Sequence, residues 1–260
     1  MNSFKPVLQL LMIAAITSSK IISDTNVVHG DTILTDSIFY SSGKKKEVRR
    51  YKNKKIDGQQ IEWYESGKIK EKSIYKDDCP LDTMISFFEN GNKSHIAIFC
   101  KCKRNGIAIS WDSLGDTVLF KPYHNGKPVG FHQEYYSKGK PSRFTHYDSL
   151  GRKQGLEEYW QENGARGDSA FFRDNEYVEI RQYFNDGKPR LWMKYSAPDV
   201  LDTAIAYAPD GKNVSTVSKG SGDMMLFSED QTQIFIVRYT NGKYEWAKPL
   251  KDALPKTKEK

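Results

Sequence analysis

The sequence predicts an all-β protein: an elongated antiparallel meander of β-hairpin repeats that builds an open twisted sheet. Three observations predict it: glycine recurs every 24 residues, an aromatic residue stands four positions before each such glycine, and another stands eight positions after most of them. The glycines are Gly43, Gly67, Gly91, Gly115, Gly139, Gly164, Gly187 and Gly211, with one step of 25 and one of 23. We expect each to be a structural turn.

Residues 1–19 have the composition of a secretory signal peptide. Lys5 precedes an apolar run over 7–16, and small polar residues follow it. The run is too short to span a bilayer comfortably, although an uncleaved anchor is the alternative. No cysteine follows it, so we expect no lipoprotein anchor. The sequence therefore predicts export to the periplasm, the outer surface or the medium, with residues 20–37 as a lead-in segment.

Residues 38–215 contain the hairpin repeats. Segments such as Gln60–Trp63 alternate polar and apolar residues, which is typical of a half-buried strand. The first aromatic column is Phe39, Trp63, Phe87, Trp111, Tyr135, Trp160, Tyr183 and Tyr207, and the second is Tyr51, Tyr75, Phe99, Tyr123, Tyr147, Phe172 and Tyr195. One hairpin cannot bury its rings alone, so we expect stacked neighbours to form a continuous apolar ridge. Little or no helix is expected after the signal peptide.

Turn residues appear twice in each repeat. The main glycine column includes Asn-Gly and Asp-Gly pairs, which supply the positive φ of tight hairpin turns. A second column holds Gly58, Gly106, Gly130 and Gly155, with Asp82 in one slot. We interpret this second column as the other turn of each hairpin.

The pattern decays toward the C-terminus. The step from Gly211 to Gly242 is 31 residues long, with a Gly-Ser-Gly loop between them. We expect residues 216–250 to be a degenerate terminal repeat that caps the array, because an array must shield its last open face. Residues 251–260 are predicted to be a basic disordered tail.

Positive charge is concentrated near the N-terminal end of the array. The chain has a net charge of +7, and residues 44–55 carry a dense basic cluster. The candidate contact residues of this cluster are Lys44, Lys45, Lys46, Arg49 and Arg50. They would suit an anionic envelope surface such as lipid headgroups, or they are simply solvated edge residues. We expect no nucleic-acid partner, since an exported protein seldom meets nucleic acid.

One position after the first aromatic column, further rings should point to the other face of the sheet. These candidate contact residues are Tyr40, Tyr64, Phe88, Tyr136 and Phe184. An uncovered face would make them an aromatic contact stripe. A covered face would make them a second core layer, and the sequence does not decide which.

Three cysteines leave at least one thiol without a partner in the chain. Cys79 and Cys102 fit the repeat register, but a two-strand offset should exceed the usual Cα separation of a disulfide. A metal site built from Cys79, His95, Cys100 and Cys102 is disfavoured because the spacing matches no common zinc pattern.

No arrangement typical of catalysis emerges from the sequence. The five histidines share no partner spacing, and no nucleophile elbow or phosphate loop occurs. We therefore expect a protein that is not an enzyme and needs no cofactor.

The repeat unit, for example Trp63-Tyr64-Glu65-Ser66-Gly67-Lys68, resembles the MORN-repeat variant family, often labelled YwqK-type antitoxin components. The resemblance implies an array of hairpins that acts as a scaffold, and lipid binding has been proposed for such arrays. The leading hypothesis is an exported, non-enzymatic platform that binds another protein. The alternatives are an antitoxin or immunity-type inhibitor, a label that fits poorly with a leader peptide, and an envelope protein that contacts anionic lipid.

Overall fold

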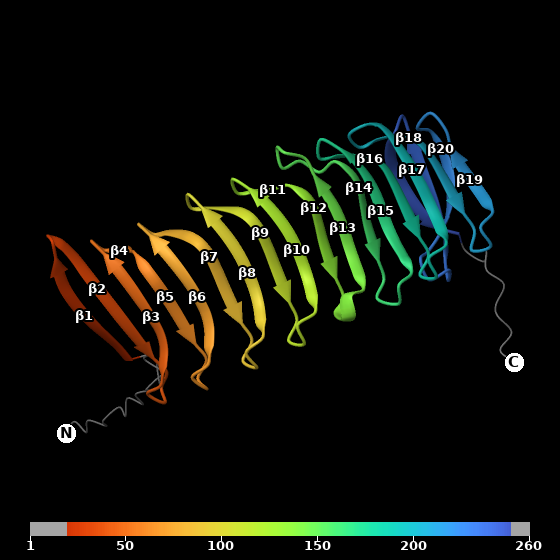
Figure 1. The fold of residues 1–260 in the computed structure, drawn as a ribbon. Helices are drawn as coiled ribbons and strands as arrows, with labels where there is room; N and C mark the ends of the chain where they lie inside the picture. The colour runs from red at the N-terminus through yellow and green to blue at the C-terminus, as the bar shows by residue number, and fades with distance from the viewer. Residues whose placement is uncertain (1–19, 251–260) are drawn as a thin grey trace, which may run out of the picture.

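The computed structural model describes residues 20–250, and most of them lie in β-strands (Figure 1). The strands of the long sheet are β1 (Lys20–Val28), β2 (Asp31–Phe39), β3 (Lys45–Lys52), β4 (Lys55–Ile56), β5 (Gly58–Trp63), β6 (Ile69–Lys76), β7 (Cys79–Phe87), β8 (Lys93–Cys100), β9 (Lys103–Trp111), β10 (Thr117–His124), β11 (Lys127–Pro128), β12 (Gly130–Tyr135), β13 (Pro141–Tyr147), β14 (Gly155–Trp160), β15 (Arg166–Arg173), β16 (Glu176–Tyr183), β17 (Pro189–Ala197), β18 (Val200–Tyr207) and β19 (Asn213–Val217). A second sheet contains β20 (Gly222–Phe227), β21 (Ile234–Thr240) and β22 (Lys243–Pro249). Helical geometry in the described residues is limited to one 3-10 turn, η1 (Ser137–Gly139). The predicted all-β fold is confirmed.

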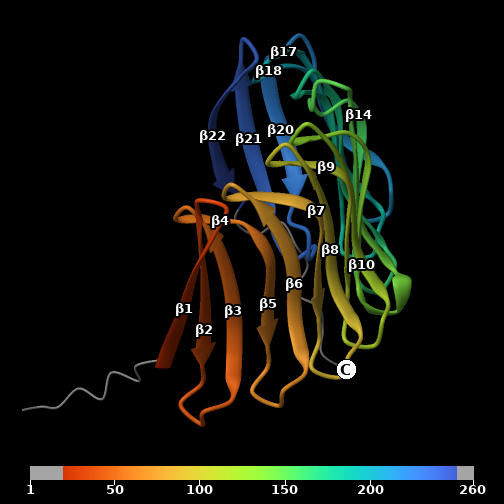
Figure 2. The same cartoon turned by 60° about the vertical axis from the view of Figure 1, so that its left-hand side comes forward.

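The long sheet has 19 strands that follow one another in hairpin order, each antiparallel to its neighbours. Figure 1 shows them as one row, with β1 at the N-terminal end. The turned view in Figure 2 shows that the row coils, so that β20–β22 lie beside β17 and β18. The sheet does not close on itself, which leaves β1 as an edge strand.

At one edge of the sheet, three-residue loops that end in glycine connect the strands. The Tyr64 N–H donates to the Lys68 carbonyl at 2.8 Å, and the Gly67 N–H donates to the Tyr64 carbonyl at 2.9 Å. Gly67 has a φ of +89°, a conformation in which a side chain would be strained. All eight glycines of the 24-residue series lie at this edge with positive φ. The period in the sequence is therefore the distance between equivalent loops.

The opposite edge mostly has two-residue turns, and the second glycine column does not form them. Asn53 and Lys54 make one such turn with φ values of 50° and 69°, the type I′ geometry of tight hairpins. Gly58 lies further along, where the strand breaks between β4 and β5 and its register with β3 shifts. Gly106, Gly130, Gly155 and Asp82 take the equivalent place, all with positive φ. The second turn was therefore predicted wrongly: a β-bulge also needs positive φ, so glycine marks the bulge.

Strand pairing defines two faces of the long sheet, because directly opposite residues share a face. Face A carries a central belt of small or polar side chains that are buried: Gln60, Ser73, Ala97, Ala108, His132, Thr145 and Glu157. Residues of the second aromatic column flank this belt, and the His132 ring lies 5.6 Å from Tyr123 and 4.6 Å from Tyr147. The aromatic columns are half-buried rather than fully buried, so each repeat contributes only a thin core.

The main hydrophobic core lies at the C-terminal end, where β20–β22 cover face A of β17–β19. Its buried members are Leu191, Met193, Leu201, Ala204, Ala206, Val217, Met224 and Val237. Two glycines bring the cap close to β18: the Gly242 N–H donates to the Gly220 carbonyl, and the Leu201 N–H donates to the Gly242 carbonyl. A Cβ on Gly220 would lie 2.5 Å from the Leu201 carbonyl oxygen. The segment predicted as a degenerate repeat thus folds as a small sheet packed on the array.

Cys79 and Cys102 form a disulfide with a Cα separation of 4.7 Å, which corrects the expectation that they lie too far apart. The expectation applied strand spacing to residues that lie at turns. Successive loops at this edge contact each other directly, as the hydrogen bond from the Asp78 N–H to the Ile56 carbonyl shows. Cys100 remains free and exposed. The bridge ties two consecutive hairpins together.

The predicted signal peptide (1–19) and basic tail (251–260) lie outside the described residues. Between residues 20 and 250, no helix is long and apolar enough to cross a membrane.

Candidate contact surface

The five candidate aromatic contact residues follow the loop edge of the sheet, where four are half-buried and Phe184 is fully buried. The hydroxyls of Tyr40 and Tyr64 donate at 2.7 Å to the carbonyls of Trp63 and Phe87, at the corresponding strand end of the next repeat. Tyr136 makes the same contact with Trp160 at 2.9 Å. These tyrosines therefore link neighbouring repeats along the loop edge.

The remaining two members occupy the same loop position. Phe88 is half-buried, and Phe184 is completely buried, with an exposed fraction of 0%. The β20–β21 loop lies against this position, since the Asn185 N–H donates to the Glu229 carbonyl. Phe184 is thus a core residue of the capped end and cannot contact a partner. Of the two interpretations, a second packing layer fits these rings better than an exposed contact stripe.

The basic cluster is partly neutralised by its neighbours. Arg49 binds Glu47 through two hydrogen bonds, of 2.5 and 2.9 Å, and Lys52 lies 2.7 Å from Asp31. Lys45 and Lys46 lie over the rings of Trp63 and Tyr40, at 5.8 Å from each ring centre. Lys44 and Arg50 form no ion pair in the described structure. Because its charges are spread over both faces and several are paired, this segment gives limited support for an anionic surface site.

Face B carries an apolar stripe that the sequence analysis did not identify. Direct pairing places Ile85, Ile96, Ile109 and Phe120 in one row across β7–β10. A second row runs beside it and contains the most exposed members, which define the apolar stripe: Ile74, Leu81, Ile107, Phe131, Leu156 and Phe171. Phe131 is 54% exposed and Phe171 is 44% exposed. Large apolar side chains therefore face solvent on one open face of the sheet from β6 to β15.

Aromatic packing gives the middle of the stripe a fixed shape. The Phe131 ring lies 5.2 Å from Phe144 and 4.6 Å from His146. These rings belong to β12 and β13, whose backbones are paired along their length. A surface of this kind loses little conformational entropy when it binds. The signal in the sequence was present: Ile107, Phe131 and Leu156 recur at steps of 24 and 25 residues.

Face A has a charged network behind the stripe. The Glu157 carboxylate accepts hydrogen bonds from Arg143 at 2.6 Å, from Thr145 at 2.9 Å and from Lys153 at 3.0 Å. Burial raises the pKa of Glu157, but these three side-chain bonds outweigh burial and hold the pKa below its ordinary value. The network stabilises the junction of β13 and β14, where the repeat contains an inserted residue.

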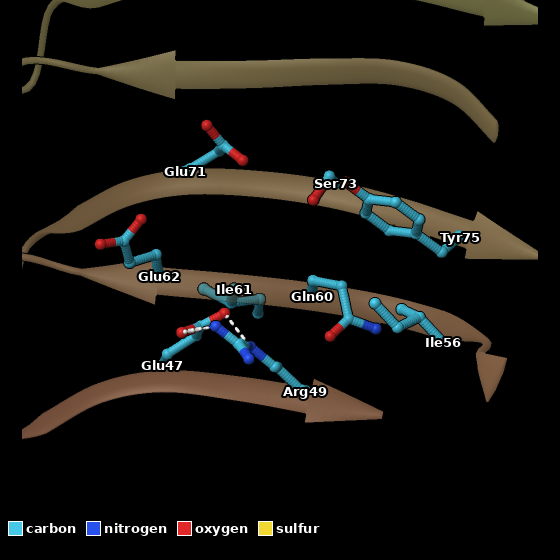
Figure 3. A pocket seen from close by; sticks show the side chains of 9 residues that line it. All are labelled: Glu47, Arg49, Ile56, Gln60, Ile61, Glu62, Glu71, Ser73 and Tyr75. Atoms are coloured by element: carbon cyan, nitrogen blue, oxygen red, sulfur yellow. Dashed lines mark hydrogen bonds and ion pairs between the residues drawn. The ribbon is translucent and has the colours of Figure 1, made fainter. Parts of the chain in front are cut away.

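A shallow pocket of about 340 Å³ lies on face A over β3, β5 and β6 (Figure 3). Glu47, Glu62 and Glu71 face one another across the three strands. Each carboxylate has its own donor: Arg49 for Glu47, Lys70 for Glu62 at 2.8 Å, and Ser86 for Glu71 at 3.0 Å. Glu47 and Glu62 are thus ion-paired, whereas Glu71 has only the neutral hydroxyl of Ser86 as its donor.

Metal chemistry finds no support in the part of the chain that the structure describes. No group of three or more histidine, cysteine, aspartate or glutamate residues there could hold a metal ion. The disulfide removes Cys79 and Cys102 as ligands, so these cysteines cannot build the four-residue site that the sequence analysis considered and disfavoured. No protein-family model and no curated protein sequence matches the chain.

Proposed function

We propose that the protein is a non-enzymatic binding platform that presents the apolar stripe of face B to another protein. The observation that carries the proposal is the row of exposed apolar side chains from Ile74 to Phe171 on an open sheet. Water contacts these side chains in the free protein, and covering them with a partner removes that apolar area from solvent.

The shape of the surface favours a macromolecular partner over a small molecule. The stripe crosses many strands, and its rings lie on a sheet face rather than in an enclosed pocket. Polar side chains lie at one end of the stripe, where Leu156 and Phe171 line a shallow pocket together with Glu179 and Arg181. A protein with a complementary apolar surface is the partner that this chemistry fits.

The proposed setting is the bacterial envelope or the exterior, on the basis of the signal-like residues 1–19. The resemblance to the MORN-repeat variant family also supports a scaffold role. The Cys79–Cys102 bridge is compatible with this setting, because disulfides persist in oxidising compartments.

Affinity capture from envelope and culture fractions tests the proposal. The double variant Phe131→Thr with Phe171→Thr removes two exposed rings and keeps residues that suit a strand. Tyr159→Thr is the matched control, because Tyr159 is a 39% exposed aromatic on face A. Mass spectrometry should find one protein that the wild type and the control retain and the double variant loses.

Equal capture by all three proteins would refute the stripe as the contact surface. The identity of the captured protein separates the hypotheses: a toxin would assign the immunity role, and a structural envelope protein would assign the scaffold role. Binding to anionic vesicles that the double variant retains would favour the lipid alternative instead.

A further inference from the structure

The N-terminal edge strand β1 is unprotected, unlike the other end of the molecule. All nine residues of β1 are exposed, and Ile21 and Val27 are 59% and 72% exposed. Strand β1 pairs with β2 alone and lies at the outer end of the row in Figures 1 and 2. The opposite edge strand of the long sheet, β19, pairs with β18 alone but lies against β20 of the cap. The outer strand of the cap, β22, carries lysines and ends in Pro249, features that discourage edge pairing.

The backbone of β1 offers a regular set of free hydrogen-bonding groups. The Thr32 N–H donates to Asn53 Oδ1, and the Thr32 carbonyl accepts from the Asn53 N–H. The backbone polar groups of Thr32 are therefore directed toward β3, and those of its neighbour Asp31 are directed toward β1. Asp31 pairs with Val28 across the two-residue turn, so every second residue of β1 from Val28 backward bonds to β2. The residues whose N–H and carbonyl groups point outward are Ile21, Ser23, Thr25 and Val27.

The side-chain pattern of β1 is complementary to itself. In an antiparallel pair of two β1 strands related by a two-fold axis, centring the register on Asp24 pairs Ile21 with Val27 and Ser23 with Thr25. This register pairs all four outward-pointing residues of each strand. It also places the two most exposed apolar side chains of one copy against those of the other. Its cost is that the two Asp24 carboxylates face each other.

We propose that β1 binds β1 of a second copy of this chain in this register, joining two long sheets edge to edge into one. The occupant is a second copy because the same strand supplies both halves of the match. The β1 edge is distinct from the stripe on face B, so the dimer does not depend on the proposed function and each is tested separately. Pairing along a single strand buries little area, so we expect a dissociation constant on the order of 10 µM.

Sedimentation velocity over about 1–300 µM tests the dimer with the protein as purified after expression. Thr25→Pro removes an outward N–H and leaves the bonds from β1 to β2 intact, because Thr25 does not bond to β2. Thr25→Val is its control, since it retains the N–H. We expect the wild type and Thr25→Val to dimerise and Thr25→Pro to remain a monomer.

Asp24→Asn supplies a second variant in case proline unfolds the strand. It removes the facing negative charges, so dimerisation should tighten about two- to fivefold. A wild type that is monomeric throughout the range, or a dimer that Thr25→Pro does not weaken, would overturn the proposal. An unchanged or weaker dimer in Asp24→Asn would overturn the register.

Discussion

Replacing Glu157 with glutamine should destabilise the array far more than the same change at its neighbour Glu158. The glutamine keeps the shape of the side chain but removes the charge that Arg143 and Lys153 share. The Glu157 side chain is 5% exposed, whereas Glu158 lies on the other face and is 3.8 Å from its partner Arg166. The two changes therefore compare a buried and a surface ion pair in one strand.

The magnitude follows from the exposure of the partners. Removing one member of a fully buried ion pair costs about 3–5 kcal/mol. Arg143 and Lys153 are 30% and 26% exposed, so water partly solvates them after the change. We therefore expect a loss of about 2 kcal/mol for Glu157→Gln and at most about 0.5 kcal/mol for Glu158→Gln.

Urea unfolding followed by tryptophan fluorescence measures both values, and its pH dependence tests the cause. Because the pKa of Glu157 is lowered in the folded protein, its contribution is complete above the ordinary pKa of a glutamate. The contribution disappears as the pH falls through the lowered folded-state pKa. The difference between wild type and Glu157→Gln should thus be full at pH 7 and shrink in acid. Equal losses for the two variants at pH 7 would refute the reasoning.

Three further changes probe other parts of the fold, each read by the free energy of unfolding. Phe184→Ala should cost about 3–5 kcal/mol because it empties a completely buried site, and a loss below about 1 kcal/mol would place Phe184 outside the core. Tyr64→Phe removes the hydrogen bond to the Phe87 carbonyl and should cost about 1 kcal/mol; no change would mean that the hydroxyl does not link repeats. Replacing Cys79 and Cys102 together with serine should cost about 3 kcal/mol, and a reductant should have the same effect on the wild type but none on the variant.

The sequence predicted the features that repeat, because each of them reflects a local requirement. Positive φ at Gly67 and its equivalents is a property of one loop, so a glycine column located that edge of the sheet. The same reasoning assigned the turns at the other edge to the wrong residues. Gly58 also needs positive φ, but a bulge imposes that need, while Asn53 and Lys54 form the turn.

Features that depend on packing between distant segments could not be predicted in this way. Phe184 belongs to the same column as Tyr64, and it is buried because the loop after β20 covers it. The apolar stripe has a signal in the sequence, the recurrence of Ile107, Phe131 and Leu156, but the bulges shift the register, so simple alternation does not show that Phe171 shares their face. The Cys79–Cys102 distance depends on contact between loops, which strand spacing does not describe.

The most direct test of the account is photo-cross-linking in the producing cell. A photoreactive amino acid at Phe131 on β12 samples face B, and the same group at Tyr159 on β14, two strands away, samples face A. We expect one discrete cross-linked partner from position 131 and none from position 159. Cross-links from 159 alone, or the same partners from both positions, would contradict the assignment of face B as the contact surface.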